Sequence, residues 1–273
     1  MKIPFTKCHA NGNDFILILS ENFPDIDAKE SIIQRLCNRH TGIGSDGLFI
    51  ISPSEKNDFL LDYYNSDGSW ETFCANGSRG VSLFMYQSGK VGQKMIFETG
   101  AGVHWSEIKS DTMVVMSMRT PEYKSEELNP EGSAGFFVNS GAHHFVCESD
   151  NLEEEYVLNL GRRIRQHQLF QPKGINVNFY KLVNDGTVEI RTYEKGVEQM
   201  VLSCSSGSTA VVFHLSQSFG LSSPITTTSL GGKLQFTFDK NWEDSTCEGA
   251  AEILYSGEFN YSPLYNACYW DTI

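Results

Sequence analysis

The chain has 273 residues, of which 40% are hydrophobic and 12% aromatic, and its formal net charge is −13. This composition can build hydrophobic cores and excludes a disordered chain, and the length allows one large domain or two of ordinary size. The acidic charge and the absence of a long Lys/Arg run argue against nucleic acid or an anionic membrane as a partner.

Cysteine usage and the N-terminal sequence indicate the compartment. Met1 is followed by polar residues and not by the apolar region of a signal peptide, and no stretch approaches the length of an apolar membrane span. The cysteines are odd in number and form no C-x-x-C pair. We therefore expect a cytoplasmic protein with reduced thiols and no metal site. The cysteines are Cys8, Cys37, Cys74, Cys147, Cys204, Cys247 and Cys268.

Short apolar runs separated by Gly, Asn and Asp turns predict strands, with few helices between them. A helix is expected over 28–38, because Ile32, Ile33 and Leu36 fall on one side of it. Strands are expected over 15–19, 48–51, 59–64, 136–138, 234–238 and 253–255.

Two hairpins are predicted from turn signals. Residues 175–183 and 187–193 flank Asn184-Asp185-Gly186, and residues 103–108 and 112–118 flank Lys109-Ser110-Asp111. Residues 119–135 contain Pro, Gly and several acidic side chains, which is typical of a linker.

Two of the cysteines each begin a Gly/Ser-rich turn that leads into a probable helix. The segments are CANGSRG, starting at Cys74, and CSSGSTA, starting at Cys204, and an apolar stretch follows each. A thiol at a helix N-terminus faces backbone N–H groups and the positive end of the helix dipole, which lowers its pKa. The same N–H groups can bind a carboxylate. The pattern predicts two thiols that act on one anionic substrate.

The surroundings of the two cysteines indicate an internal duplication. A strand leads to Asn65, nine residues before Cys74, and another leads to Glu194, ten residues before Cys204. Two equivalent domains that face each other would place the two thiols across one cleft. The remaining cysteines are interpreted as small buried core residues.

Two opposed thiols can invert a stereocentre. With a substrate carboxylate on the helix N-termini, one thiolate removes the α-proton and the opposite thiol returns a proton to the other face. The backbone N–H groups stabilise the negative charge that develops on the carboxylate. This scheme needs no metal and no pyridoxal cofactor.

Several motifs resemble diaminopimelate epimerases, the pyridoxal-independent epimerases of bacterial lysine and peptidoglycan synthesis. The opening FTKCHANGNDF (5–15) resembles F-x-K-M-H-G-x-G-N-D-F, and GIGSDGL (42–48) resembles G-I-G-x-D-x-L. Further along, NSDGS (65–69), CANGSR (74–79), INV (175–177), YEKG (193–196) and CSSG (204–207) resemble N-x-D-G-S, C-G-N-G-x-R, x-N-V, Y-E-R-G and C-G-T-G.

The resemblance implies an α+β fold of two pseudo-symmetric domains. Each would be a mixed sheet curled around a central helix, with the active site in the cleft between them. The implied domains are 1–119, to which 261–273 return, and 120–260. A homodimer is expected from the family.

The resemblance also assigns roles to residues of this chain. Cys74 and Cys204 would be the acid–base pair, and His144, with Glu194, would tune a catalytic thiol. The α-carboxylate would bind at Ala75, Asn76, Ser205 and Ser206, and the distal end of the substrate at Asn13, Asn65, Asn176, Glu194 and Lys195.

The chain departs from the family pattern at the distal end. The family's G-N-P-H is GAHH here, which places Ala142 where the family has Asn, and Lys195 replaces an Arg. Lys offers a point charge where Arg would grip a carboxylate with two hydrogen bonds. We therefore expect epimerisation of LL- to meso-diaminopimelate with a relaxed preference for the far end. The alternatives are another cofactor-independent amino-acid racemase, a phenazine-pathway type of isomerase, and a non-catalytic small-molecule binding protein.

Overall fold

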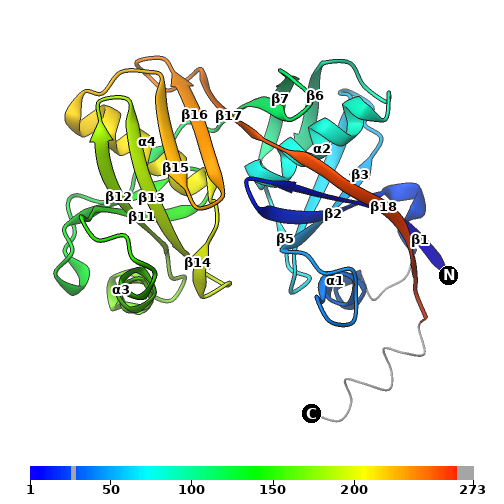
Figure 1. Cartoon of the computed structure of the whole chain (residues 1–273), viewed down its shortest axis with the longest axis horizontal. Helices are drawn as coiled ribbons and strands as arrows, with labels where there is room; N and C mark the ends of the chain where they lie inside the picture. Colours follow the sequence, from blue (N-terminus) through cyan, green and yellow to red (C-terminus); the bar gives the residue numbers. More distant parts are fainter. Residues whose placement is uncertain (26–28, 263–273) are drawn as a thin grey trace, which may run out of the picture. The chain divides into compact units, whose positions relative to one another are not determined.

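The computed structural model describes residues 1–25 and 29–262, which divide into two compact units. Of the described residues, the first unit comprises those within 1–10, 14–112 and 251–262, and the second comprises Asn11–Asn13 and Met113–Ala250. Each unit is a mixed β-sheet with a helix against one face (Figure 1). The predicted α+β class with two domains is confirmed.

In the first unit the strands pair in the order β18–β1–β2–β3–β4–β6–β7, and β5 adds to β4. The pairs β2–β3 and β4–β6 are parallel. The strands are β1 (Lys2–Ala10), β2 (Asn13–Leu19), β3 (Gly47–Ser52), β4 (Phe59–Asn65), β5 (Trp70–Glu71), β6 (Lys94–Thr99), β7 (Gly102–Ile108) and β18 (Glu252–Asn260).

The helices of the first unit are α1 (Lys29–Cys37) and α2 (Ala75–Gln87), with a short 3₁₀ turn at Ser20–Asn22. As predicted, α1 buries Ile32, Ile33 and Leu36 in the core. Nearly every side chain from Ala75 to Val81 is buried, because α2 is enclosed by β1, β7 and β18. Small residues in this helix allow the strands to approach it closely.

In the second unit the order is β9–β10–β11–β12–β13–β15–β16–β17–β8, and β14 adds to β13. The pairs β11–β12 and β13–β15 are parallel. The strands are β8 (Met113–Ser117), β9 (Glu122–Tyr123), β10 (Gly135–Asn139), β11 (His143–Glu148), β12 (Asn176–Asn184), β13 (Thr187–Glu194), β14 (Gln199–Val201), β15 (Ile225–Ser229), β16 (Gly232–Phe238) and β17 (Ser245–Ala250).

The helices of this unit are α3 (Glu154–Gln166) and α4 (Ser205–Phe219), with 3₁₀ turns at Pro130–Gly132 and Gln168–Phe170. The strands curl around α4, which contacts β10, β11, β12, β15 and β16 (Figure 1). The outer helix α3 packs on β12 and β13.

The two units repeat one topology. The run β1–β2–β3–β4–β6–β7 corresponds to β10–β11–β12–β13–β15–β16, and parallel pairs occur at the same two places in each. The helices α1 and α3 each link the strands of a parallel pair, and α2 and α4 each follow the short strand at the same point. The duplication predicted from the sequence is confirmed.

Three local predictions have a clear outcome. The hairpin around Asn184-Asp185-Gly186 is confirmed, since β12 and β13 pair antiparallel. The hairpin predicted for 103–108 and 112–118 is wrong, because β7 pairs with β6 whereas β8 pairs with β17. The segment 119–135 is not a linker. It lies in the second unit, where β9 pairs with β10 and Pro130 is buried.

Apart from the short segment Asn11–Asn13, the chain passes between the units at 112/113 and 250/251. These positions differ from the expected limits at 119 and 260, because β8 joins the second sheet and β18 already pairs with β1. Of the segment 261–273 that was expected to return to the first domain, residues 263–273 lie outside the described residues.

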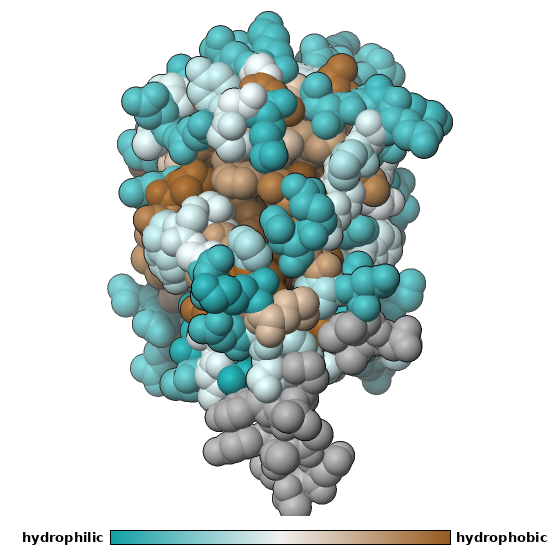
Figure 2. All heavy atoms as spheres, turned by 90° about the vertical axis from the view of Figure 1, so that its right-hand side faces the viewer, coloured by the Kyte–Doolittle hydropathy of each residue, from teal (hydrophilic) through white to brown (hydrophobic). Residues whose placement is uncertain are grey.

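Large hydrophobic side chains are exposed on β6, β7 and β18 of the first unit, in addition to Trp70 on β5. Figure 2 shows apolar residues gathered between polar ones on the face that it presents. The exposed side chains on β6, β7 and β18 are Ile96, Val103, Trp105, Leu254 and Tyr255.

No described helix has the length and apolarity needed to cross a membrane.

Candidate active site

Both cysteines singled out in the sequence are the residues that immediately precede a central helix. Cys74 has an extended backbone (φ −140°, ψ 109°) before α2, and Cys204 has nearly the same one (φ −133°, ψ 104°) before α4. In each case the carbonyl of the cysteine accepts the first helical hydrogen bond, from Ser78 or Ser208, at 2.9 Å. Both cysteines are reduced and half-buried. The predicted placement at two helix N-termini is confirmed.

The first helical residues supply the backbone of the expected carboxylate seat. Ala75 and Asn76 begin α2, and Ser205 and Ser206 begin α4. The first N–H groups of a helix have no acceptor within the helix, so they favour an anion there. The side chain of Asn76 accepts a hydrogen bond from Nη2 of the fully buried Arg79 at 2.7 Å.

Polar side chains lie against the first turn of α4. Nε2 of His144 is 3.0 Å from Oγ of Ser206, and this Oγ is 3.5 Å from Sγ of Cys204. On its other side, Nδ1 of His144 is 3.0 Å from Nδ2 of Asn178. Oδ1 of Asn178 accepts a hydrogen bond from the Thr192 hydroxyl at 2.9 Å. We call Thr192, Asn178, His144 and Ser206 the polar chain.

The polar chain is buried and its histidine is neutral. His144, Asn178 and Thr192 are buried, and Ser206 is half-buried. Burial lowers the pKa of His144 to about 3, with a smaller effect from the charge of His143. From the sequence, His144 was expected near a catalytic thiol. In the structure its Nε2 contacts the hydroxyl of Ser206, and that hydroxyl contacts the sulfur of Cys204.

Aromatic side chains lie against the first turn of α2. The rings of Phe49 and Tyr63 stack at 4.9 Å between centroids, and Phe15 meets Phe49 edge-on at 5.5 Å. The ring of Phe49 packs directly on Gly77, where an added Cβ would come within 2.0 Å of it. We call Phe15, Phe49 and Tyr63 the aromatic cluster.

The residues expected to bind the distal end of the substrate fall into both units. Asn65, at the end of β4, accepts a hydrogen bond from the Tyr63 hydroxyl at 2.9 Å. In the second unit, Oδ1 of Asn176 accepts from the backbone N–H of Lys195 at 2.9 Å, and Glu194 ends β13 beside it. Asn13, at the start of β2, also groups with the second unit.

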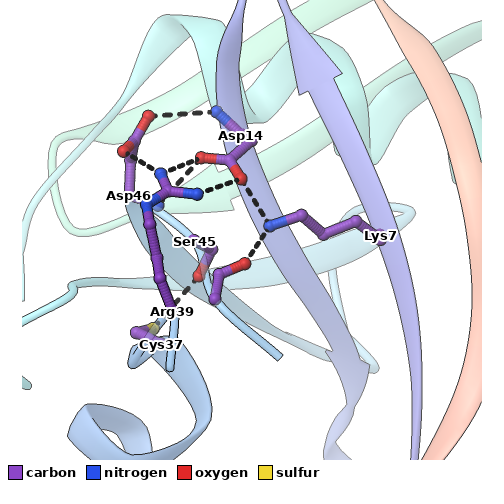
Figure 3. A network of polar contacts seen from close by, with 7 residues as sticks. Lys7, Asp14, Cys37, Arg39, Ser45 and Asp46 are labelled. Atoms are coloured by element: carbon purple, nitrogen blue, oxygen red, sulfur yellow. Dashed lines mark hydrogen bonds and ion pairs between the residues drawn. The ribbon is translucent and has the colours of Figure 1, made fainter. Parts of the chain in front are cut away.

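A cluster of four charged residues was missed by the sequence reasoning, although each lies in or beside a quoted motif (Figure 3). Asp14 accepts from Lys7 at 2.6 Å and from both terminal nitrogens of Arg39 at 3.1 and 2.8 Å, and Arg39 also reaches Asp46 at 2.7 Å. Lys7 is buried and also donates to the carbonyl of Gly44. We call Lys7, Asp14, Arg39 and Asp46 the charge cluster.

The charge cluster holds the loops beside two of the expected substrate residues. Asp14 directly follows Asn13, and the carbonyl of Asp46 accepts from the N–H of Ser66, next to Asn65, at 3.2 Å. Burial raises the pKa of Asp14, but hydrogen bonds from Arg39 and Lys7 outweigh it and bring the pKa down to about 2. Asp14 therefore stays ionised at neutral pH.

The other described cysteines are buried, as predicted. Burial raises the pKa of Cys8 and Cys147 to about 12 and that of Cys37 to about 11. Cys247 is fully buried as well, and Cys268 lies outside the described residues. In the described part of the chain, no group of three or more His, Cys, Asp or Glu side chains is arranged to hold a metal ion.

The motifs quoted from the sequence all lie within the residues that match a known protein family. The sequence profile of diaminopimelate epimerase matches residues 5–124 and 136–254. The chain is 36% identical to the diaminopimelate epimerase of Aquifex aeolicus, over 95% of this chain and 99% of that protein. It belongs to the diaminopimelate epimerase family. Membership makes this chain an isomerase and confirms the resemblance seen in the sequence.

Two further similarities agree with this family. The diaminopimelate epimerase of Archaeoglobus fulgidus is 34% identical over 97% of this chain and 99% of its own. A crystal structure of a hydroxyproline epimerase from Agrobacterium vitis has a TM-score of 0.74, at 14% identity, over 97% of this chain and 94% of that one. At that identity the structural likeness concerns the fold alone.

Proposed function

We propose that this chain inverts the α-carbon of diaminopimelate, LL to meso, with Cys74 and Cys204 as the acid–base pair. The observation that carries this proposal is the pair of cysteines with matching backbone conformation at the N-termini of the two central helices. Family membership supplies the substrate. The product would serve lysine and peptidoglycan synthesis.

The proposed reaction is a proton transfer at each face of the α-carbon. The α-carboxylate binds the N–H groups that begin α2 and α4, at Ala75, Asn76, Ser205 and Ser206. One thiolate takes the α-proton, the electron pair delocalises onto the carboxylate, and the opposite thiol delivers its proton to the other face. The thiolate and thiol have then exchanged roles. The mechanism requires no cofactor.

The distal end of the substrate would lie against Asn13, Asn65, Asn176, Glu194 and Lys195. Ala142 and Lys195 offer fewer hydrogen bonds than the Asn and Arg of the family pattern. We therefore propose a relaxed preference at this end, and these two positions also favour a second candidate, an amino-acid racemase with a different side-chain preference.

We further propose a cytoplasmic homodimer. The exposed hydrophobic side chains on β6, β7 and β18 support an interface on the first unit. Sedimentation equilibrium of wild type and of Trp105→Glu tests this part of the proposal. A monomeric wild type would contradict it.

The test of the reaction is solvent deuterium exchange at the α-carbon, followed by NMR in reducing buffer. With LL-diaminopimelate we expect exchange with inversion, and inversion should fall by about 10²–10⁴-fold in Cys74→Ala and in Cys204→Ala. Simple amino acids run in parallel measure the preference. No exchange with diaminopimelate but exchange with another amino acid would favour the second candidate, and binding that survives both substitutions without any turnover would favour a non-catalytic protein.

A further inference from the structure

The hydrogen bonds of the polar chain have a fixed direction, and the orientation of Asn178 sets it. Its Nδ2 lies 3.3 Å from the backbone carbonyl of Phe145, an atom that can only accept. The amide NH₂ must therefore face Phe145, and Oδ1 must face the hydroxyl of Thr192, which donates to it. The opposite orientation of the amide would set two acceptors against each other.

The orientation of Asn178 determines the tautomer of His144. The same NH₂ group is 3.0 Å from Nδ1 of His144, so Nδ1 accepts and carries no proton. Burial keeps His144 neutral, and a neutral imidazole has one N–H. That proton is on Nε2, which therefore donates to Oγ of Ser206 at 3.0 Å.

The direction continues to the sulfur. With its oxygen accepting from His144, the Ser206 hydroxyl is free to direct its own proton at Sγ of Cys204, 3.5 Å away. A thiolate only accepts, so this hydrogen bond must run from Ser206 to Cys204 whenever the cysteine is ionised. The backbone of Ser206 is also held, because its carbonyl accepts from the Ser140 hydroxyl at 2.7 Å.

We infer that Cys204 is tuned by a neutral, one-directional chain of hydrogen bonds, in which Ser206 is the group that touches the thiolate. His144, Asn178 and Thr192 act through Ser206 as positioning residues. In this arrangement His144 does not take the proton of Cys204. The polar chain stabilises the thiolate of Cys204 relative to the thiol, because hydrogen bonds to a charged acceptor are roughly twice as strong as neutral ones.

This inference deepens the proposed function, on which it rests for the role of Cys204 in turnover. The neighbouring titratable groups include His143, beside His144 on β11, and Cys204, beyond Ser206. Cys147 also lies close, with its Sγ 3.8 Å from the backbone carbonyl of Asn178, and burial raises its pKa to about 12. A Cβ at position 207 would come within 2.2 Å of Oδ1 of Asn178. Gly207, in the first turn of α4, therefore leaves the space that the Asn178 side chain of the polar chain occupies.

The deciding variant is Ser206→Ala, with Ser206→Thr as its control. The alanine keeps the backbone N–H of the carboxylate seat and removes only the hydroxyl, whereas threonine restores it. The pKa of Cys204 is read from the pH dependence of iodoacetamide labelling, by peptide mass spectrometry, in a Cys74→Ala background. We expect Ser206→Ala to raise it by about one unit, a tenfold loss of thiolate at neutral pH, and Ser206→Thr to restore it.

Turnover gives a second, independent readout. In the Cys74-containing protein, Ser206→Ala should lower kcat, change KM little, and move the acidic limb of the kcat/KM profile to higher pH. An unchanged labelling pKa in Ser206→Ala would overturn the inference. Labelling requires no turnover, so a shifted pKa without epimerisation would leave the chain standing and refute only the proposed reaction.

The tautomer can be observed directly by ¹⁵N NMR of histidine-labelled wild type. We expect His144 to show a protonated Nε2 and a bare Nδ1, with no titration between about pH 5 and 8. An imidazolium signal, or a proton on Nδ1, would contradict the direction of the chain whatever the substrate proves to be.

Discussion

The first turns of α2 and α4 share a backbone design and differ in what lies against them. Three residues after each cysteine is a glycine, and its bare face meets the aromatic ring of Phe49 in the first unit and the amide of Asn178 in the second. These two residues lie on corresponding strands, and their antiparallel partners are Tyr63 and Thr192. The aromatic cluster and the polar chain are therefore the same structural position filled with opposite chemistry.

This difference gives the two cysteines unlike surroundings within their own units. Hydrogen-bond donors lead to Cys204 through Ser206, whereas the position equivalent to the polar chain in the first unit is filled by rings. The charge cluster of the first unit lies elsewhere and holds the loops next to Asn13 and Asn65. One unit uses ionic contacts to hold its loops, and the other uses neutral hydrogen bonds to tune its cysteine.

The largest loss of folding stability is expected when the charge cluster of the first unit is broken. Asp14→Asn leaves the buried Lys7 beside a neutral amide, and breaking a buried pair in this way costs about 3–5 kcal/mol. Urea denaturation of the variant should show a loss of this size. The control is Glu258→Gln, which breaks the exposed Lys2–Glu258 pair and should leave the denaturation midpoint nearly unchanged, because exposed ion pairs contribute little to stability. Equal losses in the two variants would show that the charge cluster has no special role.

The second prediction is that the stabilities of the two units depend differently on pH. His144 has a pKa of about 3 when folded and an ordinary value of 6.5, so below pH 6.5 the unfolded chain gains a proton that the folded one excludes. Stability should fall by about 2 kcal/mol at pH 5 from this group alone. His214, whose pKa burial lowers to about 4, acts in the same direction in the same unit.

The stabilisation by Asp14, in the first unit, is lost only at lower pH. Its pKa is about 2 in the folded chain against an ordinary 3.8, so its stabilisation is complete above pH 3.8 and is lost as the pH falls toward 2. Hydrogen exchange at pH 5 should therefore show lost protection in α4 and β11–β13 while α2 and β1–β4 keep theirs. His144→Gln should flatten the dependence in the second unit. Loss of protection in the first unit first would contradict the assignment.

Much of this arrangement was predictable from sequence. Local signals sufficed for the position of both cysteines, since a Gly/Ser turn before an apolar run marks a helix start, and for the β12–β13 hairpin, whose turn is Asn-Asp-Gly. The pairing of β8 with β17 was not predictable, because the two strands are far apart in the sequence and the local turn at 109–111 suggested another partner. Contacts at long range depend on which sheet edge is open, and no local pattern encodes that.

Two members of the polar chain, Asn178 and Thr192, were missed for a related reason. Asn178 and Thr192 look like ordinary strand residues, and only the register of β12 and β13 sets them opposite each other below α4. The alternation of buried polar residues at Asn176 and Asn178 was the one available signal. In the charge cluster, Lys7 and Asp14 of one quoted motif and Asp46 of another are joined by ion pairs, and the sequence assigned no role to any of them.

The smallest expected effect compares Tyr63 and Thr192, the corresponding hydroxyl-bearing residues of the two units. Tyr63→Phe removes a hydrogen bond to Asn65, and Thr192→Val removes the first link of the polar chain; each loss should cost about 1 kcal/mol of stability. Their functional consequences should differ. Tyr63→Phe should raise KM for diaminopimelate and leave the pKa of Cys204 unchanged, whereas Thr192→Val should raise that pKa by a few tenths of a unit and leave KM unchanged. Thermal unfolding, labelling and steady-state kinetics on the two variants measure all three quantities. The same change in KM and in the pKa of Cys204 in both variants would mean that the aromatic cluster and the polar chain have the same functional effect, despite their different chemistry.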